Sequence, residues 1–302
     1  METPGNIGRR EFIAGAVAAV AKESFPAGAA SCGDVVMVSD EHVSGDSAHG
    51  IFKSFSAIVD EILALDPRPA RVVSFGDMSH AHGRKADYSR LLPLFMRLKN
   101  AGMELSFLMG NHDRRGPFRE VFGDLVAPSP FKSRIVSLAS AGELDLILLD
   151  TLDESGDPSR PNAVEGRTGP AQIDWARQII KERKRPAIVC AHHPQNDSLF
   201  RDLIFGEPLV CGVIHGHEHF WSSGFYRKPA FPRLVRKAGL PSTGIWGDIG
   251  YAVLRQPSPG RAELRLRERD FFFPHQPKRG TTDPLSESIM RDNNAAVCSF
   301  TW

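Results

Sequence analysis

Residues 35–42 read VVMVSDEH, a short apolar run that is followed at once by an aspartate, a glutamate and a histidine. Such a run predicts a strand that is buried on both faces. The same pattern returns at 71–77 (RVVSFGD) and at 105–113 (LSFLMGNHD). It recurs at 187–193 (AIVCAHH) and at 209–219 (LVCGVIHGHEH). Five predicted strands therefore end in side chains that can bind metals.

Helical patterns separate these strands. Ile51, Phe55, Ile58 and Ile62 follow at helical spacing. We also expect helices over residues 88–99 and 171–182, and strands that alternate with helices predict an α/β sandwich. The last third of the chain favours β-structure. The further predicted strands are 133–138, 144–149, 243–246, 250–255 and 262–269.

The composition is that of a soluble globular protein. The 302 residues include 37 basic and 36 acidic side chains, so no basic excess indicates a nucleic-acid partner. Hydrophobic residues make up 41% and charged residues 24%, which excludes general disorder and a polytopic membrane protein. Four cysteines are too few for a disulfide scaffold. Cys190 and Cys211 lie in strand-like runs, which predicts buried free thiols.

The first thirty residues resemble a twin-arginine export signal. Arg9-Arg10 precedes a mildly apolar run that is too short to span a bilayer, and Ala27-Gly28-Ala29 offers a cleavage pattern. The alternative is an amphipathic helix packed on the domain. We expect export to the periplasm or the exterior, with lipid anchoring at Cys32 as a less favoured variant. The predicted organisation is a signal at 1–30, one domain at 31–273 and an extended tail at 274–302, with no transmembrane span in the mature chain.

The residues that follow the strands have the chemistry of a metal site. The carboxyl ends of parallel strands converge on one crevice, so separate loops can meet there. Aspartate, asparagine and neutral histidine suit first-row divalent ions, and D-x-H or H-x-H places two donors on the same side of an extended segment. Each fragment alone is as easily a polar turn. Five such fragments, each behind an apolar strand, favour a metal centre.

In order, the motifs D-x-H, G-D, G-N-H-D, H and G-H-x-H resemble the pattern of the calcineurin-like metallophosphoesterase family. The resemblance covers most of the chain after the signal and implies a four-layer α/β sandwich with a β-rich C-terminal third. It also implies a centre of two divalent transition-metal ions: iron, manganese or zinc. Asp40, His42 and His219 would hold one ion, Asn111, His192 and His217 the second, and Asp77 would bridge them.

The resemblance further implies hydrolysis of a phosphoester by a metal-bound hydroxide. His112 would stabilise or protonate the leaving oxygen, and Asp113 would orient the His112 ring. Arg114 or Arg115 would reach the substrate phosphate, unless both are solvated loop charges. His80 stands where the family often has an acidic residue, and we expect it to act near the ligands rather than as one.

The predicted function is phosphoester hydrolysis on a small-molecule substrate, with a slight preference for diesters. A phosphomonoesterase would use the same ligands and differ in its pocket. A different class, an exported protein that binds metal or phosphate without catalysis, is less favoured because the ligand set and His112 are all present. Nuclease activity is also less favoured, since the net charge is near zero. His193 and His215 are expected to support the ligands.

Overall fold

A computed structural model describes most of the chain between residues 33 and 302. The described residues are 33–47, 49–195, 197–228, 231–244, 246–268 and 296–302. The predicted export signal, the predicted lipidation site at Cys32 and most of the predicted tail lie outside these residues.

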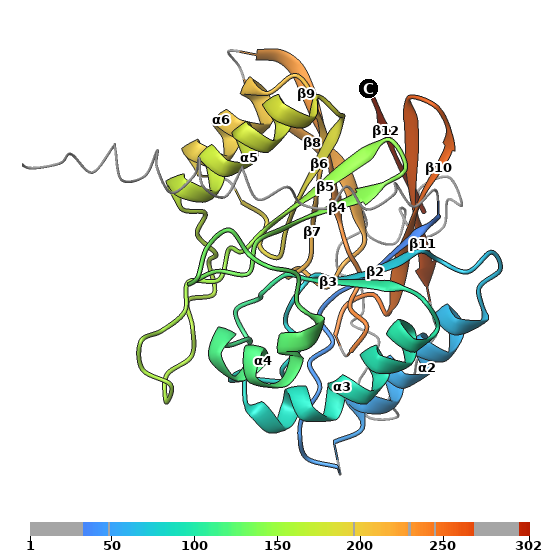
Figure 1. Ribbon diagram of the computed structural model, residues 1–302, viewed down its shortest axis with the longest axis vertical. Coiled ribbons are helices and arrows are strands. Elements are labelled where there is room, and N and C mark those ends of the chain that lie inside the picture. The colour runs from blue at the N-terminus through green and yellow to red at the C-terminus, as the bar shows by residue number, and fades with distance from the viewer. Residues whose placement is uncertain (1–32, 48, 196, 229–230, 245, 269–295) are drawn as a thin grey trace, which may run out of the picture.

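The described strands form two six-stranded sheets (Figure 1). In spatial order, the first sheet holds β12 (Val297–Thr301), β11 (Arg261–Glu268), β10 (Gly250–Ser258), β1 (Val35–Val38), β2 (Arg71–Ser74) and β3 (Glu104–Phe107). The second holds β4 (Ser137–Ala141), β5 (Leu144–Leu149), β6 (Ala187–Ala191), β7 (Val210–His215), β9 (Phe231–Gly239) and β8 (Ser222–Lys228). Strands β1 to β3 are parallel, as are β5, β6, β7 and β9.

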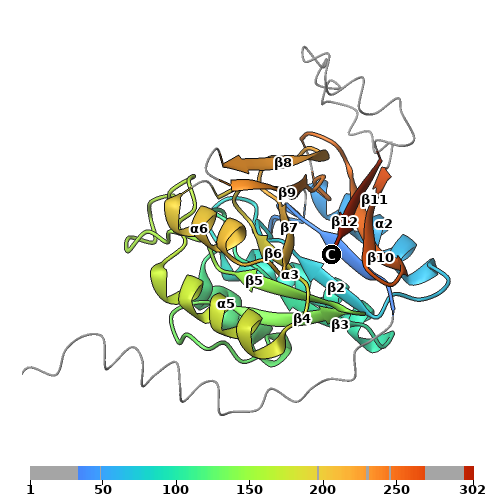
Figure 2. The same ribbon diagram turned by 90° about the horizontal axis from the view of Figure 1, so that it is seen from above.

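Helices cover the outer faces of the two sheets. They are α2 (Ile51–Ala64), α3 (Lys85–Asn100), α4 (Arg115–Phe122), α5 (Pro170–Arg183) and α6 (Ser198–Gly206), with a 3-10 turn η1 (Gly123–Leu125) after α4. Helices α5 and α6 lie on one side of the sheets and α2 on the other (Figure 2). The predicted four-layer α/β sandwich is confirmed.

The alternation of side chains along β1 explains the layers. Val35 and Met37 pack in the core between the sheets, whereas Val36 and Val38 pack in a second core with residues of α2 and α3. In the other sheet, Ile147 of β5 packs with α5 and α6 in a third core. Strands buried on both faces must be apolar throughout, which is why these runs stand out in the sequence.

The parallel strands bring the motif loops to one edge of the sandwich. The Asp40 N–H donates to the Gly76 carbonyl at 3.0 Å, which joins the loops after β1 and β2. The Gly216 N–H donates to the His192 carbonyl at 3.0 Å, which joins the loops after β6 and β7. The His217 N–H donates to the Asp40 carboxylate at 3.2 Å and the His112 N–H to the Asp77 carboxylate at 2.7 Å, so five segments from two sheets share one edge.

The structure corrects three sequence predictions. The strand expected at 133–138 begins at Ser137 instead. No strand forms at 243–244 or at Trp246, because Thr243 bonds to the loop after β1 rather than to a neighbouring strand. Residues 297–301 of the expected tail form β12, with Cys298 and Phe300 buried between the sheets.

Four elements were missed. Strands β8 and β9 mix serine, glycine, arginine and lysine with their apolar residues, so they lack a continuous apolar run. Helix α4 contains Gly116 and Pro117, which read as a loop, although Phe118 and Phe122 face the core. Helix α6 begins after Asp197, whose carboxylate accepts the Phe200 N–H.

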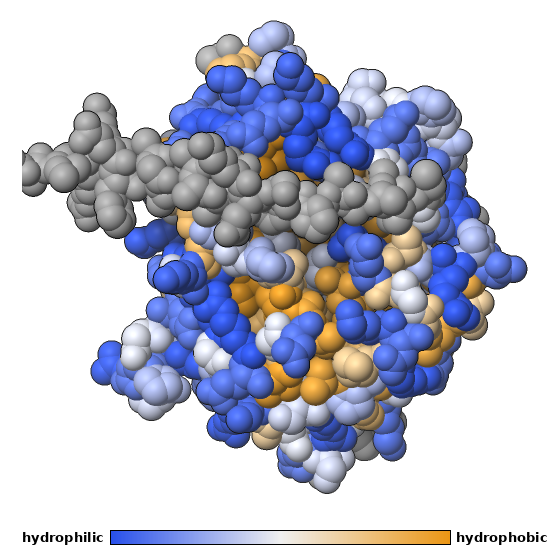
Figure 3. Space-filling view, in the orientation of Figure 1, coloured by the Kyte–Doolittle hydropathy of each residue, from blue (hydrophilic) through white to orange (hydrophobic). Residues whose placement is uncertain are grey.

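The described surface is mixed. Hydrophilic residues dominate around α5 and α6, and hydrophobic residues reach the surface near α3 and α4 (Figure 3).

Among the described residues, no helix combines the length and the apolar character needed to cross a membrane. Cys190, Cys211 and Cys298 are free thiols; the predicted buried free thiol is confirmed at Cys190, whereas Cys211 is free but only partly buried.

Candidate metal centre

Four predicted ligands form the first cluster. The ligand atoms of Asp40, His42, Asp77 and His219 all lie within 4.8 Å of one another. The Nε2 atoms of His42 and His219 are 3.2 Å apart, and His219 Nε2 is 3.2 Å from Asp40 Oδ1. Neutral imidazole nitrogens and carboxylate oxygens that point at one another repel unless a proton or a cation lies between them. The donor set therefore fits a divalent transition metal.

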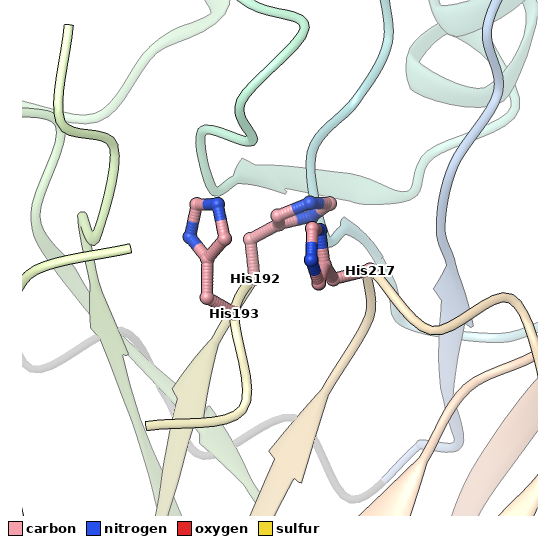
Figure 4. Close-up of side chains that lie close together, drawn as sticks. All are labelled: His192, His193 and His217. Atoms are coloured by element: carbon pink, nitrogen blue, oxygen red, sulfur yellow. The ribbon is translucent and has the colours of Figure 1, made fainter. Parts of the chain in front are cut away.

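The other predicted ligands form the second cluster. His217 Nδ1 is 3.0 Å from Asn111 Oδ1, so imidazole and amide donors meet there. Figure 4 shows His192, His193 and His217 close together, and one nitrogen from each lies within 4.8 Å of the others. His193 was expected to be a supporting residue, but the geometry adds it to the candidate donors of this cluster.

Asp77 lies between the two clusters. Its Oδ2 atom is 3.9 Å from His42 Nε2 in the first cluster and 3.3 Å from His192 Nε2 in the second. Its Oδ1 atom accepts the His112 N–H at 2.7 Å, which fixes the carboxylate. The Asp77 carboxylate therefore faces donors of both clusters.

The backbone at the ligands is unusual. Asp40, His42, Asp77, His217 and His219 all have positive φ values between 45° and 69°. Non-glycine residues rarely adopt this region, and such strain concentrates at functional sites. A Cβ atom at Gly110 would overlap with the Asp77 carboxylate, so only glycine lets the third motif loop approach the second.

Hydrogen bonds orient two histidines of the second cluster. His192 Nδ1 is 2.7 Å from the Phe75 carbonyl oxygen, so Nδ1 donates its proton there and Nε2 is the nitrogen that faces Asp77. His193 Nδ1 is 2.8 Å from Thr151 Oγ1. Among the described residues, His193 Nε2 has no hydrogen-bond partner although it is buried.

The electrostatics favour ionised carboxylates beside imidazoles. Burial opposes ionisation of Asp40, but a hydrogen bond and charge attraction from His219 outweigh it and lower its pKa to about 2. Burial also opposes the charged form of His192, yet attraction to Asp77 raises its pKa to about 9. Burial lowers the pKa values of His42 and His217 to about 4, so both imidazoles are neutral at pH 7 and able to bind a cation.

The predicted role of Asp113 is wrong. Its carboxylate does not touch the His112 ring, because it accepts the N–H groups of Asp77, Ser79 and Gly110 and the Tyr88 hydroxyl, at 2.8 to 3.2 Å. Asp113 therefore ties the second motif loop to the third. Burial and the nearby Asp77 charge raise its pKa to about 6.

The His112 ring lies beside the first cluster. Its centroid is 4.6 Å from that of His42, in an edge-to-face arrangement. Its Nδ1 atom is 2.8 Å from the His80 carbonyl oxygen, which leaves Nε2 as the exchangeable nitrogen. His80 thus supports His112 through its backbone, while its own ring packs against His49, with centroids 4.5 Å apart.

Both arginines that were predicted to bind substrate are engaged by the protein. The Arg114 guanidinium donates to the carbonyls of Ser155, Asp157 and Arg160. Arg115 forms a two-pronged pair with Asp150, with both N–O distances 2.7 Å. Both arginines are buried. These contacts assign them to holding the loop after β5 and correct the predicted contact with substrate.

Two supporting residues had no recognisable signal in the sequence. The Asn162 amide donates to the carbonyls of Asn111 and Asp113 at 2.8 and 2.7 Å, which holds the third motif loop in place. Tyr88 of α3 donates to Asp113 and accepts the Arg114 N–H. Neither residue lies near these partners in the chain, so only the fold reveals the contacts.

Comparisons with known proteins find distant relatives of this chain. A probable cyclic nucleotide phosphodiesterase of Psychrobacter arcticus is 26% identical over 163 residues, or 52% of this chain. The chain spans about half (54%) of the length of that curated relative. Among solved structures, TT1561 of Thermus thermophilus is 14% identical, with a TM-score of 0.46, over 79% of this chain and 98% of that one. A 5′-nucleotidase precursor of the same organism is 16% identical, with a TM-score of 0.49, over 78% and 54%.

The sequence profile described as calcineurin-like phosphoesterase matches residues 33–220, a span that contains every predicted ligand from Asp40 to His219. That match covers more than half of the chain, and the two ligand clusters lie inside it. The chain belongs to the calcineurin-like phosphoesterase family.

Proposed function

We propose that this protein is a dinuclear-metal phosphoesterase that hydrolyses a small-molecule substrate and prefers diesters to monoesters. One observation carries the proposal. Asp77 Oδ2 lies 3.9 Å from His42 Nε2 and 3.3 Å from His192 Nε2, so a single carboxylate faces both ligand clusters. A carboxylate that two ions share suits a two-metal site that clamps one phosphate.

When bound, a pair of divalent ions supplies Lewis acidity toward the phosphate and an acidified water. Side chains of the protein would hold the two ions and move the proton. Asp40, His42 and His219 would hold one ion, and Asn111, His192 and His217 the other, with His193 a further donor to the second.

His112 would move the proton at the leaving oxygen. Because its Nδ1–H is directed to the His80 carbonyl, Nε2 is the atom that can carry a proton to the departing oxygen. Its backbone N–H meanwhile fixes the bridging carboxylate of Asp77. General acid catalysis of this kind contributes about 10²- to 10⁴-fold.

The preference for diesters is supported by the name of the curated relative, a probable cyclic nucleotide phosphodiesterase. A monoesterase would use the same ligands and differ in how the pocket treats the second ester group.

We also propose that residues 1–30 direct export by the twin-arginine route. Cell fractionation of the full chain and of an Arg9→Lys, Arg10→Lys variant tests this, and retention of the wild type in the cytoplasm would contradict it.

The proposed activity is tested with metal-depleted full-length protein. We expect Mn²⁺, Fe²⁺ or Zn²⁺ to restore hydrolysis of bis-p-nitrophenyl phosphate, at a higher rate than that of p-nitrophenyl phosphate. Asn111→Ala should abolish the restored turnover, and Asn100→Ala, an exposed asparagine at the end of α3, should not. Bound metal without turnover on either substrate would favour the non-catalytic binding protein.

A further inference from the structure

A large aromatic residue lies at the edge of the first ligand cluster. The Trp246 ring is nearly parallel to the His219 ring, at an angle of 21° with centroids 6.1 Å apart. It meets the His42 ring edge-on, with centroids 5.9 Å apart. Trp246 is nevertheless 48% exposed, so much of the indole is open to solvent directly beside two candidate ligands.

The backbone of Trp246 is strained. Among the described non-glycine residues, seven have positive φ: five are candidate ligands, one is Lys184 at the end of α5, and the last is Trp246, with φ 72°. Lys184 ends a helix in a common left-handed cap. A bulky residue in this region has no such routine explanation, and strained residues of this kind concentrate at functional sites. Trp246 therefore has the same unusual backbone conformation as the five candidate ligands.

The loop around Trp246 is fixed to the ligand loops. The Asp248 N–H donates to the His219 carbonyl at 2.8 Å, and the Ser242 hydroxyl donates to the Asp40 carbonyl at 2.9 Å. Gly247 has φ 73°, and a Cβ atom there would overlap with the His219 carbonyl. Only glycine therefore allows the backbone at position 247 to approach His219 this closely. The backbone directly after Trp246 is therefore fixed beside His219, and the indole itself contacts the His219 and His42 rings.

We infer that Trp246 is a specificity residue: its exposed indole stacks on a planar aromatic group, a nucleobase or an aryl ring, that the phosphoester substrate carries next to its phosphate. This inference rests on the proposed function, since it needs the phosphate at the adjacent ligand clusters. Aromatic side chains stack on bases without hydrogen bonding to them, and one such contact changes affinity by about 5- to 100-fold. An open indole at this distance from His42 and His219 can select the ester group without touching the reacting atoms.

The test uses ligands that have no ester bond to break. The affinities of metal-loaded protein for phenylphosphonate and methylphosphonate are measured by titration calorimetry, together with those for the phosphonate analogues of AMP and of ribose 5-phosphate. Each pair differs only in its aromatic group, and the two pairs separate an aryl ring from a nucleobase. We expect the wild type to prefer the aromatic member of at least one pair.

Trp246→Ala should reduce that preference by about 5- to 100-fold, and Trp246→Phe should keep most of it. Trp302→Ala is the matched control, because Trp302 is 38% exposed and lies beside Gly260, at the opposite end of the first sheet from the ligands. A preference that survives in Trp246→Ala would overturn the inference, as would equal wild-type affinities within both pairs. Failure of the hydrolysis assay would count against the proposed function alone, since phosphonate binding needs no turnover.

Discussion

Replacing Arg115 distinguishes a structural role from the role in substrate binding that the sequence predicted. The Arg115 side chain is 10% exposed and that of Asp150 is fully buried. Besides its two bonds to Asp150, the guanidinium donates to the Leu152 carbonyl at 2.7 Å and to Glu154 at 2.9 Å. These contacts fasten the start of α4, which follows the third motif loop, to the segment after β5.

Arg115→Met would remove the nearer cation of the buried Asp150 carboxylate and leave the Arg134 guanidinium, 3.9 Å away, as its partner. Breaking a buried pair in this way costs about 3–5 kcal/mol. For a domain of this size we expect the melting temperature to fall by roughly 6–20 °C, since each kcal/mol is worth about 2–4 °C. Asp150→Asn should recover part of the loss in the double variant, because the amide carries no charge yet still accepts the Ile135 N–H.

Urea unfolding at pH 7 measures this cost, and steady-state kinetics on the same preparations measure KM. Arg160→Met is the control, because its exposed pair with Asp157, with an N–O distance of 3.4 Å, is worth about 0–1 kcal/mol. A loss below about 1 kcal/mol for Arg115→Met, together with a large rise in KM, would refute the structural assignment and return Arg115 to the substrate.

Three further predictions follow from the site. His112→Asn should lower kcat by about 10²- to 10⁴-fold while the metal content stays unchanged, and loss of metal would show instead that the ring is a ligand. Gly110→Ala should weaken metal binding by roughly 10- to 100-fold, because the new methyl group displaces Asp77; unchanged affinity in a metal titration would contradict this. Burial raises the pKa of Glu41 from 4.5 to about 8, so the folded metal-free protein binds a proton that the unfolded chain has released. The contribution of Glu41 to stability should therefore fall as the pH rises from about 5 to 8, by up to about 1.4 kcal/mol per pH unit. The difference in stability between the wild type and Glu41→Gln in urea unfolding isolates this contribution, and a difference that does not change with pH would contradict it.

The sequence predicted the parts of the site that depend on single strands. Asp40, Asp77 and Asn111 each follow a buried strand, and the parallel arrangement of those strands brings them to one edge. Because the motif residues lie at the ends of strands, the predicted arrangement of the strands was enough to predict that these residues come together. That is why each predicted ligand lies in one of the two clusters, with Asp77 in the first and facing the second.

Contacts between loops that are far apart in the sequence could not be predicted from the sequence. Arg115 looked available to substrate because nothing in the chain marks Asp150, 35 residues later, as its partner. Asp113 was assigned to the neighbouring His112 because of sequence proximity, yet three backbone N–H groups compete for its oxygens. Trp246 sits in a run that reads as a strand, and only its position on His219 reveals it.

The central claim is that the two clusters hold two metal ions around Asp77, and the metal stoichiometry of the full-length protein tests it most directly. Metal-stripped protein is titrated with Mn²⁺ or Zn²⁺, and the bound metal is counted by elemental analysis. We predict two ions per chain in the wild type and fewer in His42→Ala and in His192→Ala, which remove one donor from each cluster. A wild-type protein that binds no metal, or only one ion that both variants retain, would contradict the account.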